Sequence, residues 1–358
     1  MNAARIITIA RLELTQRLRS VGWYVMLGVF AVLLLGITGL AFAVFSGQET
    51  WGSGVYSVVV NFVLLLVVLV SPALSGNAIN GDRDAATLAP VQVTMASTGD
   101  IMFGKLLAAI ATGGAFLLVA VPFLLVAMLA GGVTPGMLLV SIAVLAAEII
   151  IVAALGVGLS GLLARPLFSV AATYLVVAAL VVGTLIAFGL GRPARRTEAT
   201  GYSRPWDEAK NTFDCDRWDE YTYEVPRYDY VWGFLAANPF VVLADATPTA
   251  FNDEGYPVDL FGQVKVGVRM AQLAPESQRW DDCAPTQDAW PTPEELVEGT
   301  VPSWFVGLGI QGVLAGGLFA GAWARTRTPA RRLPPGTRIA YGVCVFQQPV
   351  VCRHRFAA

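Results

Sequence analysis

Six long apolar runs divide this chain, and they constrain its fold more than any other feature. Each run is long enough for a helix that crosses the hydrocarbon core of a bilayer, which takes about 20 residues. Only 14% of the residues are charged, against about 25% in soluble proteins. The sequence therefore predicts an all-α polytopic membrane protein with six transmembrane helices. The runs are Val21–Phe45, Val55–Ser75, Leu106–Ala130, Met137–Leu163, Leu167–Leu190 and Ser303–Ala324.

The first apolar run has a second interpretation, as the core of a cleaved signal peptide. Ala41, Phe42 and Ala43 mimic a signal-peptide cleavage site. However, the apolar core of a signal peptide has about 7–15 residues, and Val21–Phe45 is 25 residues long without a charge. We therefore favour a membrane span.

Basic residues in the short loops indicate the orientation of the spans, because such residues stay on the cytoplasmic side. Arginines precede the first span, and Arg83 and Arg165 follow the second and fourth spans, whereas loops 46–54 and 131–136 have no basic residue. The alternation predicts that both termini and residues 76–105 are cytoplasmic. Residues 191–302 then lie outside.

The residues before the first span, 1–20, form the pattern of a short amphipathic helix. Ile7, Ala10, Leu14 and Leu18 share one helical face, and basic side chains occupy the other. A basic amphipathic helix next to a span is typical of a helix that lies in the membrane interface. The alternatives are an extension of the first span or a frayed terminus.

The polar stretch at residues 76–105 lies between the second and third spans and cannot itself cross the bilayer. One interpretation is a solvated connecting loop, in which Asp82, Arg83 and Asp84 keep the backbone in water. The other is a helix docked on a partner protein, with Leu88 and Val91 among its apolar contacts. Its length favours docking, because a plain connection between helices needs only a few residues.

Residues 191–302 are long enough to form a small domain between the fifth and sixth spans. They hold 20 of the 26 acidic and 10 of the 24 basic residues and are rich in aromatic side chains. Short alternating segments such as 220–230 predict strands, so we expect a small extracytoplasmic domain of mixed structure. The chain from 325 to 358 is rich in Arg and Pro. This composition predicts a loose or surface-lying cytoplasmic tail.

Two cysteines of this outer segment, Cys215 and Cys283, would lie in an oxidising compartment. A disulfide between them would stabilise the folded segment by about 3–5 kcal/mol on the chain-entropy model. The alternative is two unpaired buried thiols.

Glu148 is the one charged residue inside the predicted spans. An ionisable group in the membrane is a functional candidate by default. The alternative is a protonated or hydrogen-bonded structural carboxyl group. Asn61, in the second span, is expected to join helices rather than to bind a substrate.

Gly99–Leu106 nearly matches a phosphate-binding P-loop, but it lacks the terminal Ser or Thr and is one residue short between the glycines. Nucleotide binding by this chain is therefore not expected. The sequence also predicts no metal site, since the chain has one histidine and no Cys-x-x-Cys pair. No catalytic residue and no nucleic-acid partner are expected.

The order of residues in 76–105 resembles the coupling segment of the ABC-2 family of ATP-binding-cassette permeases. The matching residues are Asp82-Arg83-Asp84, Thr87-Leu88 and Gly104-Lys105, with Ala86 where glycine is usual. The N-terminal amphipathic segment resembles the elbow helix of that family.

This resemblance implies a permease subunit of an exporter in the plasma membrane. It implies a second permease subunit, identical or different, and a separate ATPase subunit that carries ATP and Mg²⁺, so this chain needs no cofactor and catalyses no covalent step. Asp82, Arg83, Asp84, Thr87, Leu88 and Val91 would contact the ATPase, and membrane lipid would surround the spans.

Two other functions stay open. A carrier driven by an ion gradient would need several inward-facing carboxylates and usually repeated halves, whereas Glu148 stands alone. A membrane-anchored receptor or enzyme would act through residues 191–302, in which no nucleophile–base arrangement is visible and no histidine occurs.

Overall fold

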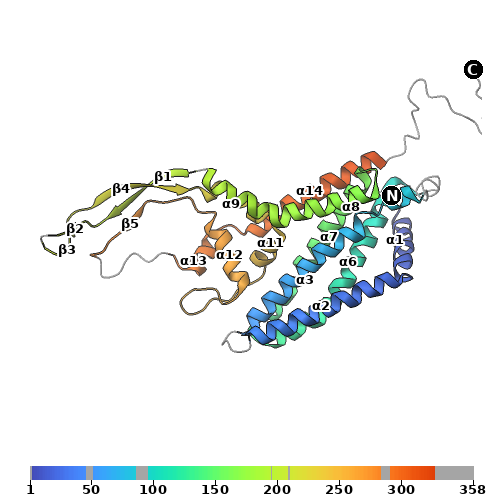
Figure 1. Cartoon of the computed structure of the whole chain (residues 1–358), viewed down its shortest axis with the longest axis horizontal. Coiled ribbons are helices and arrows are strands. Elements are labelled where there is room, and N and C mark those ends of the chain that lie inside the picture. Colours follow the sequence, from blue (N-terminus) through green and yellow to red (C-terminus); the bar gives the residue numbers. More distant parts are fainter. Residues whose placement is uncertain are drawn as a thin grey trace, which may run out of the picture. The chain divides into compact units, whose positions relative to one another are not determined.

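The structure is a computed structural model, and it describes residues 2–45, 51–85, 96–194, 196–208, 210–283 and 291–326 (Figure 1). Six of its helices are long and apolar enough to cross a membrane. The chain is thus a multi-pass membrane protein, as predicted from its six apolar runs. The six are α2 (Val21–Phe45), α3 (Trp51–Ser75) continued by α4 (Asn80–Asp84), α6 (Thr98–Leu129), α7 (Pro135–Leu162), α8 (Pro166–Ala178) continued through a π-helical turn η1 (Ala179–Gly183) into α9 (Thr184–Ala194), and α14 (Ser303–Thr326).

Local signals in the sequence explain where the helices begin. Ser97 caps α6 in a capping box, in which its hydroxyl accepts the Asp100 N–H and the Asp100 carboxylate accepts the Ser97 N–H. Thr134 caps α7 ahead of Pro135, a residue favoured in the first turn because it has no N–H to leave unpaired. Helix α6 therefore begins eight residues before the apolar run that was expected to start at Leu106.

Helix α7 lies at the centre of the bundle and contacts α3, α6, α8 and α14. Its glycines allow the close approach of α14: a Cβ on Gly158 would lie 2.9 Å from the Leu318 carbonyl carbon, and one on Gly161 would lie 2.6 Å from the Ala322 Cβ. On α14 a Cβ on Gly312, Gly316 or Gly317 would meet no described atom within 4 Å, whereas one on Gly321 would lie 3.3 Å from the Leu162 Cδ2 of α7.

The segment after the fifth span forms a small mixed sheet. Strand β1 (Arg196–Ser203) lies between β4 (Asp219–Pro226), which pairs with it antiparallel, and β5 (Gln278–Trp280), which pairs with it parallel. A two-stranded hairpin, β2 (Trp206–Asp207) and β3 (Thr212–Phe213), lies between β1 and β4 in the chain. A strand was predicted within 220–230, and β4 covers most of it.

The structure differs from the expected separate domain at 191–302, because much of this segment packs into the membrane bundle. After a 3-10 turn η2 (Tyr228–Tyr230), α10 (Trp232–Ala236) and α11 (Pro239–Ala246) contact α14, and α11 also contacts α7. Val242 and Leu243 of α11 and Phe261 of α12 (Leu260–Met270) belong to the same buried core as the spans. The short α13 (Pro293–Gly299) packs on α12. These helices are thus packed against the spans by the burial of apolar surface, and the small sheet is the part of this segment that stays distinct from the helix bundle.

Candidate functional site

The predicted charged cluster lies where the N-terminal helix α1 (Ala3–Leu18) packs on the start of α6 and the short α4 reaches α6 through an ion pair. We call this place the α1–α4–α6 junction. Helix α1 lies along α6 because Gly104 leaves room for Ile9. A Cβ on Gly104 would be 2.7 Å from both the Cβ and the Cγ2 of Ile9 and 3.1 Å from the Ile6 carbonyl oxygen. The glycine of the Gly104-Lys105 pair is therefore needed for helix packing.

Lys105 joins the three helices of the junction. Its side chain is 3% exposed, and its ammonium forms ion pairs with Glu13 of α1 and, at 2.7 Å, with the Asp82 carboxylate of α4. A buried lysine without partners would be costly, and the two carboxylates offset that cost. Sequence reasoning placed Asp82 and Lys105 in one motif but missed Glu13, whose only signal was an acid in a basic helix.

Further hydrogen bonds fix α1 against the bundle. The Arg17 guanidinium donates to the Thr112 hydroxyl of α6 and to the Leu74 carbonyl of α3, both at 2.9 Å. Burial lowers the pKa of Arg17, and the nearby charge of Glu13 partly opposes that shift. At the other end of α1, the Asn2 N–H donates to the Asp100 carboxylate at 2.8 Å. Helix α1 is therefore held at both of its ends.

Arg83 points into the bundle. Its guanidinium donates to the Gly161 and Leu163 carbonyls at the end of α7, both at 3.3 Å, and to the Thr326 hydroxyl at the end of α14 at 3.4 Å. The last carbonyls of a helix lack partners within the helix, and a cation there is favourable. Arg83 thus has a packing role among the spans that the sequence interpretation did not give it.

Asp84 is the exposed member of the cluster. It ends α4, and Ala85 after it is the last residue described before residue 96. The predicted contact residues Thr87, Leu88 and Val91 lie outside the described residues. Of the six residues expected to contact a partner, the structure brings Asp82 and Arg83 into the bundle and leaves Asp84 at its surface.

A cavity of about 200 Å³ opens at the junction. Its lining includes Glu13, Asp82 and Lys105 on one side and the apolar Ile9 and Leu12 on the other. Asp82 keeps 33% of its side chain exposed, and Leu12 is 57% exposed, so both sides can be reached from outside the protein.

The two candidate residues inside the spans lie away from this junction. Glu148 of α7 is fully buried. Within the described part of the chain neither Glu148 carboxyl oxygen has a hydrogen-bond partner of ordinary geometry. Asn61 donates to the Ser57 carbonyl of its own helix at 2.8 Å rather than to a neighbouring one, so the expected bridge between helices is not formed by that bond.

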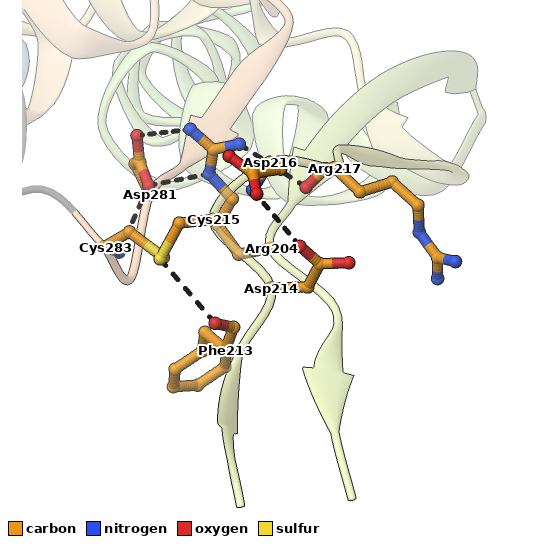
Figure 2. The surroundings of a disulfide bond; sticks show 8 residues. All are labelled: Arg204, Phe213, Asp214, Cys215, Asp216, Arg217, Asp281 and Cys283. Atoms are coloured by element: carbon orange, nitrogen blue, oxygen red, sulfur yellow. Dashed lines mark hydrogen bonds and ion pairs between the residues drawn. A yellow bond between two sulfur atoms is a disulfide. The ribbon is translucent and has the colours of Figure 1, made fainter. Parts of the chain in front are cut away.

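Cys215 and Cys283 form the predicted disulfide, which ties the hairpin region to the segment after β5. Figure 2 shows Arg204 beside this bond, with its guanidinium paired to the Asp281 carboxylate at 2.8 and 3.1 Å. The same guanidinium lies 3.7 Å from the ring centroid of Trp218. The hydrogen-bonded Arg204 holds the pKa of Asp281 below its usual value.

A second buried ionic cluster, which the sequence analysis missed, joins α11, α12 and the start of α14. Asp245 is fully buried and accepts from Arg269 Nε at 2.7 Å, the Ser303 hydroxyl at 2.9 Å and the Trp304 N–H at 3.0 Å. Arg269 also donates to the Thr300 carbonyl at 2.7 Å. The sequence feature that could have indicated this cluster was Asp245, an acidic residue within the apolar run that forms α11.

No protein-family model matches this chain, and no curated protein matches it significantly in sequence. The resemblance to the ABC-2 permeases therefore rests on the motif of residues 82–105 and on the arrangement of spans. Among the described residues, no group of three or more His, Cys, Asp or Glu side chains is placed to hold a metal ion.

Proposed function

We propose that this chain is the permease subunit of an ATP-binding-cassette exporter. The observation that carries the proposal is the position of the acidic-Arg-acidic cluster. Arg83 contacts the ends of α7 and α14, and Asp82 reaches Lys105 of α6, which also pairs with Glu13 of α1. A displacement of α4 would therefore act directly on α6, α7 and α14, and through Lys105 on α1.

In this proposal a separate ATPase subunit, which carries ATP and Mg²⁺, docks on Asp84 and on the residues that follow it, including Thr87, Leu88 and Val91. Closure of the ATPase on binding ATP moves this coupling segment. Because packed helices move as rigid bodies and have few alternative arrangements, the motion passes through Asp82 and Arg83 to the spans. Substrate leaves between this chain and a second permease subunit.

The proposal includes the orientation predicted from the basic residues. Both termini and the junction face the cytoplasm, and the small sheet with its disulfide faces the outside of the plasma membrane. A disulfide persists in an oxidising compartment, so the Cys215–Cys283 bond supports this side for the sheet. The same orientation brings α4 to the compartment that contains ATP.

Co-purification tests the proposal. An affinity-tagged chain, extracted in mild detergent, is expected to retain an ATPase subunit and to show ATP hydrolysis. Asp84→Arg should weaken the assembly about tenfold or more, because reversal of an interfacial charge places like charges together, and tenfold corresponds to about 1.4 kcal/mol. Asp84 suits this test better than Arg83, whose bonds to α7 and α14 would confound docking with folding.

Asp253→Arg is the matched control, because Asp253 is also exposed but lies between β4 and β5 in the chain, far from α4 in sequence. It should leave assembly unchanged. Retention of no ATPase by the intact wild-type chain would argue against an ABC permease and in favour of a carrier or a receptor. Equal assembly of Asp84→Arg and wild type would refute the docking role of α4.

A further inference from the structure

One face of the small sheet carries a group of aromatic rings. Side chains that alternate along a strand point to the same face, and the register of the sheet sets Tyr221 of β4 opposite Gly201 and Trp280 of β5 opposite Ser203. Tyr223 lies on this face too, with its ring centroid 5.7 Å from that of Tyr221. We call Tyr221, Tyr223 and Trp280 the aromatic face of the sheet.

A glycine in the central strand lets one of these rings lie over the sheet. A Cβ on Gly201 would be 2.4 Å from the Tyr221 Cζ, so a glycine is needed beneath this ring. Tyr221 and Trp280 are nevertheless 44% and 50% exposed. Among the described elements, the strands of the sheet pack mainly on one another rather than on a helix. The aromatic face is therefore an open surface.

Other rings of this segment already have an arginine over them. Arg204, Arg227 and Arg279 lie over the rings of Trp218, Tyr230 and Tyr202, with the guanidinium carbon 3.7, 4.5 and 5.5 Å from the ring centroids. Within the described residues, no cation of the chain lies in this way over a ring of the aromatic face. A cation is attracted to the face of such a ring, so the aromatic face is suited to receive one from a ligand.

The charge around the aromatic face also favours a cationic ligand. Residues 191–230 and 276–283 hold twelve acidic and eight basic residues, so four negative charges remain in surplus whichever ion pairs form within this segment. Strand β4 contributes Asp219, Glu220 and Glu224 and has no basic residue. The strand that carries the two tyrosines is therefore acidic.

The ion pairs of β4 leave its acids within reach of an incoming cation. Asp219 pairs with Arg217 and Glu224 pairs with Arg196, at 3.1 Å in both cases. All four side chains are more than half exposed. Exposed ion pairs contribute little to stability because water screens them. Replacing either arginine by a cation of the ligand therefore costs little.

Strand β4 also has an open edge within the described residues, because only β1 pairs with it. An edge strand presents backbone N–H and C=O groups to which another chain can add as a strand. A second copy of β4 is a poor partner, since antiparallel pairing about Thr222 would put Glu220 opposite Glu224. The acids that repel the same strand attract a basic one.

We propose that β4 and the aromatic face bind a cationic peptide in an extended conformation, added as a strand beside β4. Backbone hydrogen bonds to the edge of β4 hold the peptide. Because side chains alternate between faces, every second residue lies on the side of Tyr221 and Tyr223, where arginine or lysine meets the rings and Asp219. The residues between them lie on the side of Glu220 and Glu224. This binding does not rest on the proposed transport function, because the described residues alone form the surface.

Binding of labelled peptides to the purified full-length chain in detergent, measured by microscale thermophoresis, provides the test. The first peptide has eight residues that alternate arginine and threonine. The second is the same peptide with all of its backbone nitrogens methylated, which keeps the charge and removes the N–H donors. Methylation is expected to weaken binding about tenfold, because the hydrogen bonds to β4 are lost. Equal binding of the two peptides would overturn the proposal.

Two further probes examine the class of ligand. The same peptide with glutamate in place of arginine is expected not to bind, because β4 repels it. A neutral oligosaccharide of six N-acetylglucosamine units has rings that stack on aromatic side chains but no charge for the acids. It is expected to bind at least tenfold more weakly than the arginine peptide. Equal binding of the oligosaccharide would identify a carbohydrate platform and would overturn the proposal.

A matched pair of tyrosine variants locates the site on one face of the sheet. Tyr221→Leu removes a ring of the aromatic face, whereas Tyr202→Leu removes a tyrosine of the opposite face that already lies under Arg279. The first is expected to weaken binding of the arginine peptide about threefold, which is the usual effect of an exposed cation–π contact. The second should leave binding unchanged. Equal effects of the two variants would refute the assignment to this face.

A pair of charge variants examines the role of β4. Glu220→Lys reverses a charge on β4, and Asp253→Lys makes the same kind of change on an exposed residue outside the strands. Only the first is expected to weaken binding of the arginine peptide, about tenfold, because it places like charges together. Equal losses would show a diffuse attraction and contradict the proposal. None of these measurements involves the ATPase, so their outcome is distinguishable from that of the co-purification test.

Discussion

The two ends of the helix bundle carry buried ionic clusters of different construction. Helix α14 reaches both, because Ser303 and Trp304 at its start bond to Asp245 and Thr326 at its end bonds to Arg83. Its 24 residues span about 36 Å. At the Asp245 end, one carboxylate accepts from an arginine, a hydroxyl and a backbone N–H, and the pair is almost fully buried.

At the α1–α4–α6 junction Lys105 is buried, but its two carboxylate partners are partly exposed and line a cavity. Asp82 keeps 33% of its side chain exposed, against 0% for Asp245. Buried groups that are all hydrogen-bonded hold a single arrangement, whereas a partly solvated cluster can exchange partners at lower cost. The comparison indicates that the Asp245 end anchors the bundle and that the junction is the end able to move or bind.

Breaking the Asp245 cluster should have the largest effect. Asp245→Asn leaves Arg269 buried without a countercharge, and removing one partner of a buried pair typically destabilises by about 3–5 kcal/mol. Thermal unfolding of the detergent-solubilised chain should show the loss. Asp253→Asn, the same substitution on an exposed side chain, should change the midpoint little. A similar midpoint for both variants would contradict the anchoring role.

Separating α1 from α6 should have an intermediate effect. Gly104→Ala places a Cβ 2.7 Å from the Ile9 Cβ, and overpacking of this kind costs about 1–3 kcal/mol. Gly114→Ala is the control in the same helix, because its added Cβ would meet no described atom within 4 Å. We expect faster proteolysis or deuterium exchange of residues 3–18 in Gly104→Ala alone. Equal protection of α1 in both variants would show that the close contact does not hold it.

The partly buried ion pair between Arg204 and Asp281, next to the small sheet, should give the smallest effect. Arg204 depresses the pKa of Asp281 in the folded state, so its contribution to stability is present above the usual carboxyl value of about 4 and is lost as the pH falls through the lower folded value. Trp218 lies against Arg204. Its fluorescence should therefore change at acid pH in the wild type, and Asp281→Asn should remove that transition. An identical titration in the variant would show that the pair has no such role.

Much of the bundle could be predicted from the sequence because each span is a local feature. An apolar run of about 20 residues determines a membrane helix without reference to the rest of the chain. The first span, Val21–Phe45, coincides with α2, and the predicted start of the sixth coincides with the start of α14. The expected pairing of Cys215 with Cys283 followed from the compartment assigned to them and from their being the two cysteines of that segment.

Only the tertiary structure decided which side chains face one another. Arg83 and Asp84 are neighbours in the sequence, yet one bonds to α7 and α14 and the other is exposed, because their directions depend on where the ends of distant helices lie. Glu13 with Lys105, and Asp245 with Arg269, are pairs without any fixed spacing. An apolar run forms a membrane helix because of its own composition and the bilayer around it. The position of a charge that is buried in protein depends instead on the partner that compensates it, and only folding brings that partner near.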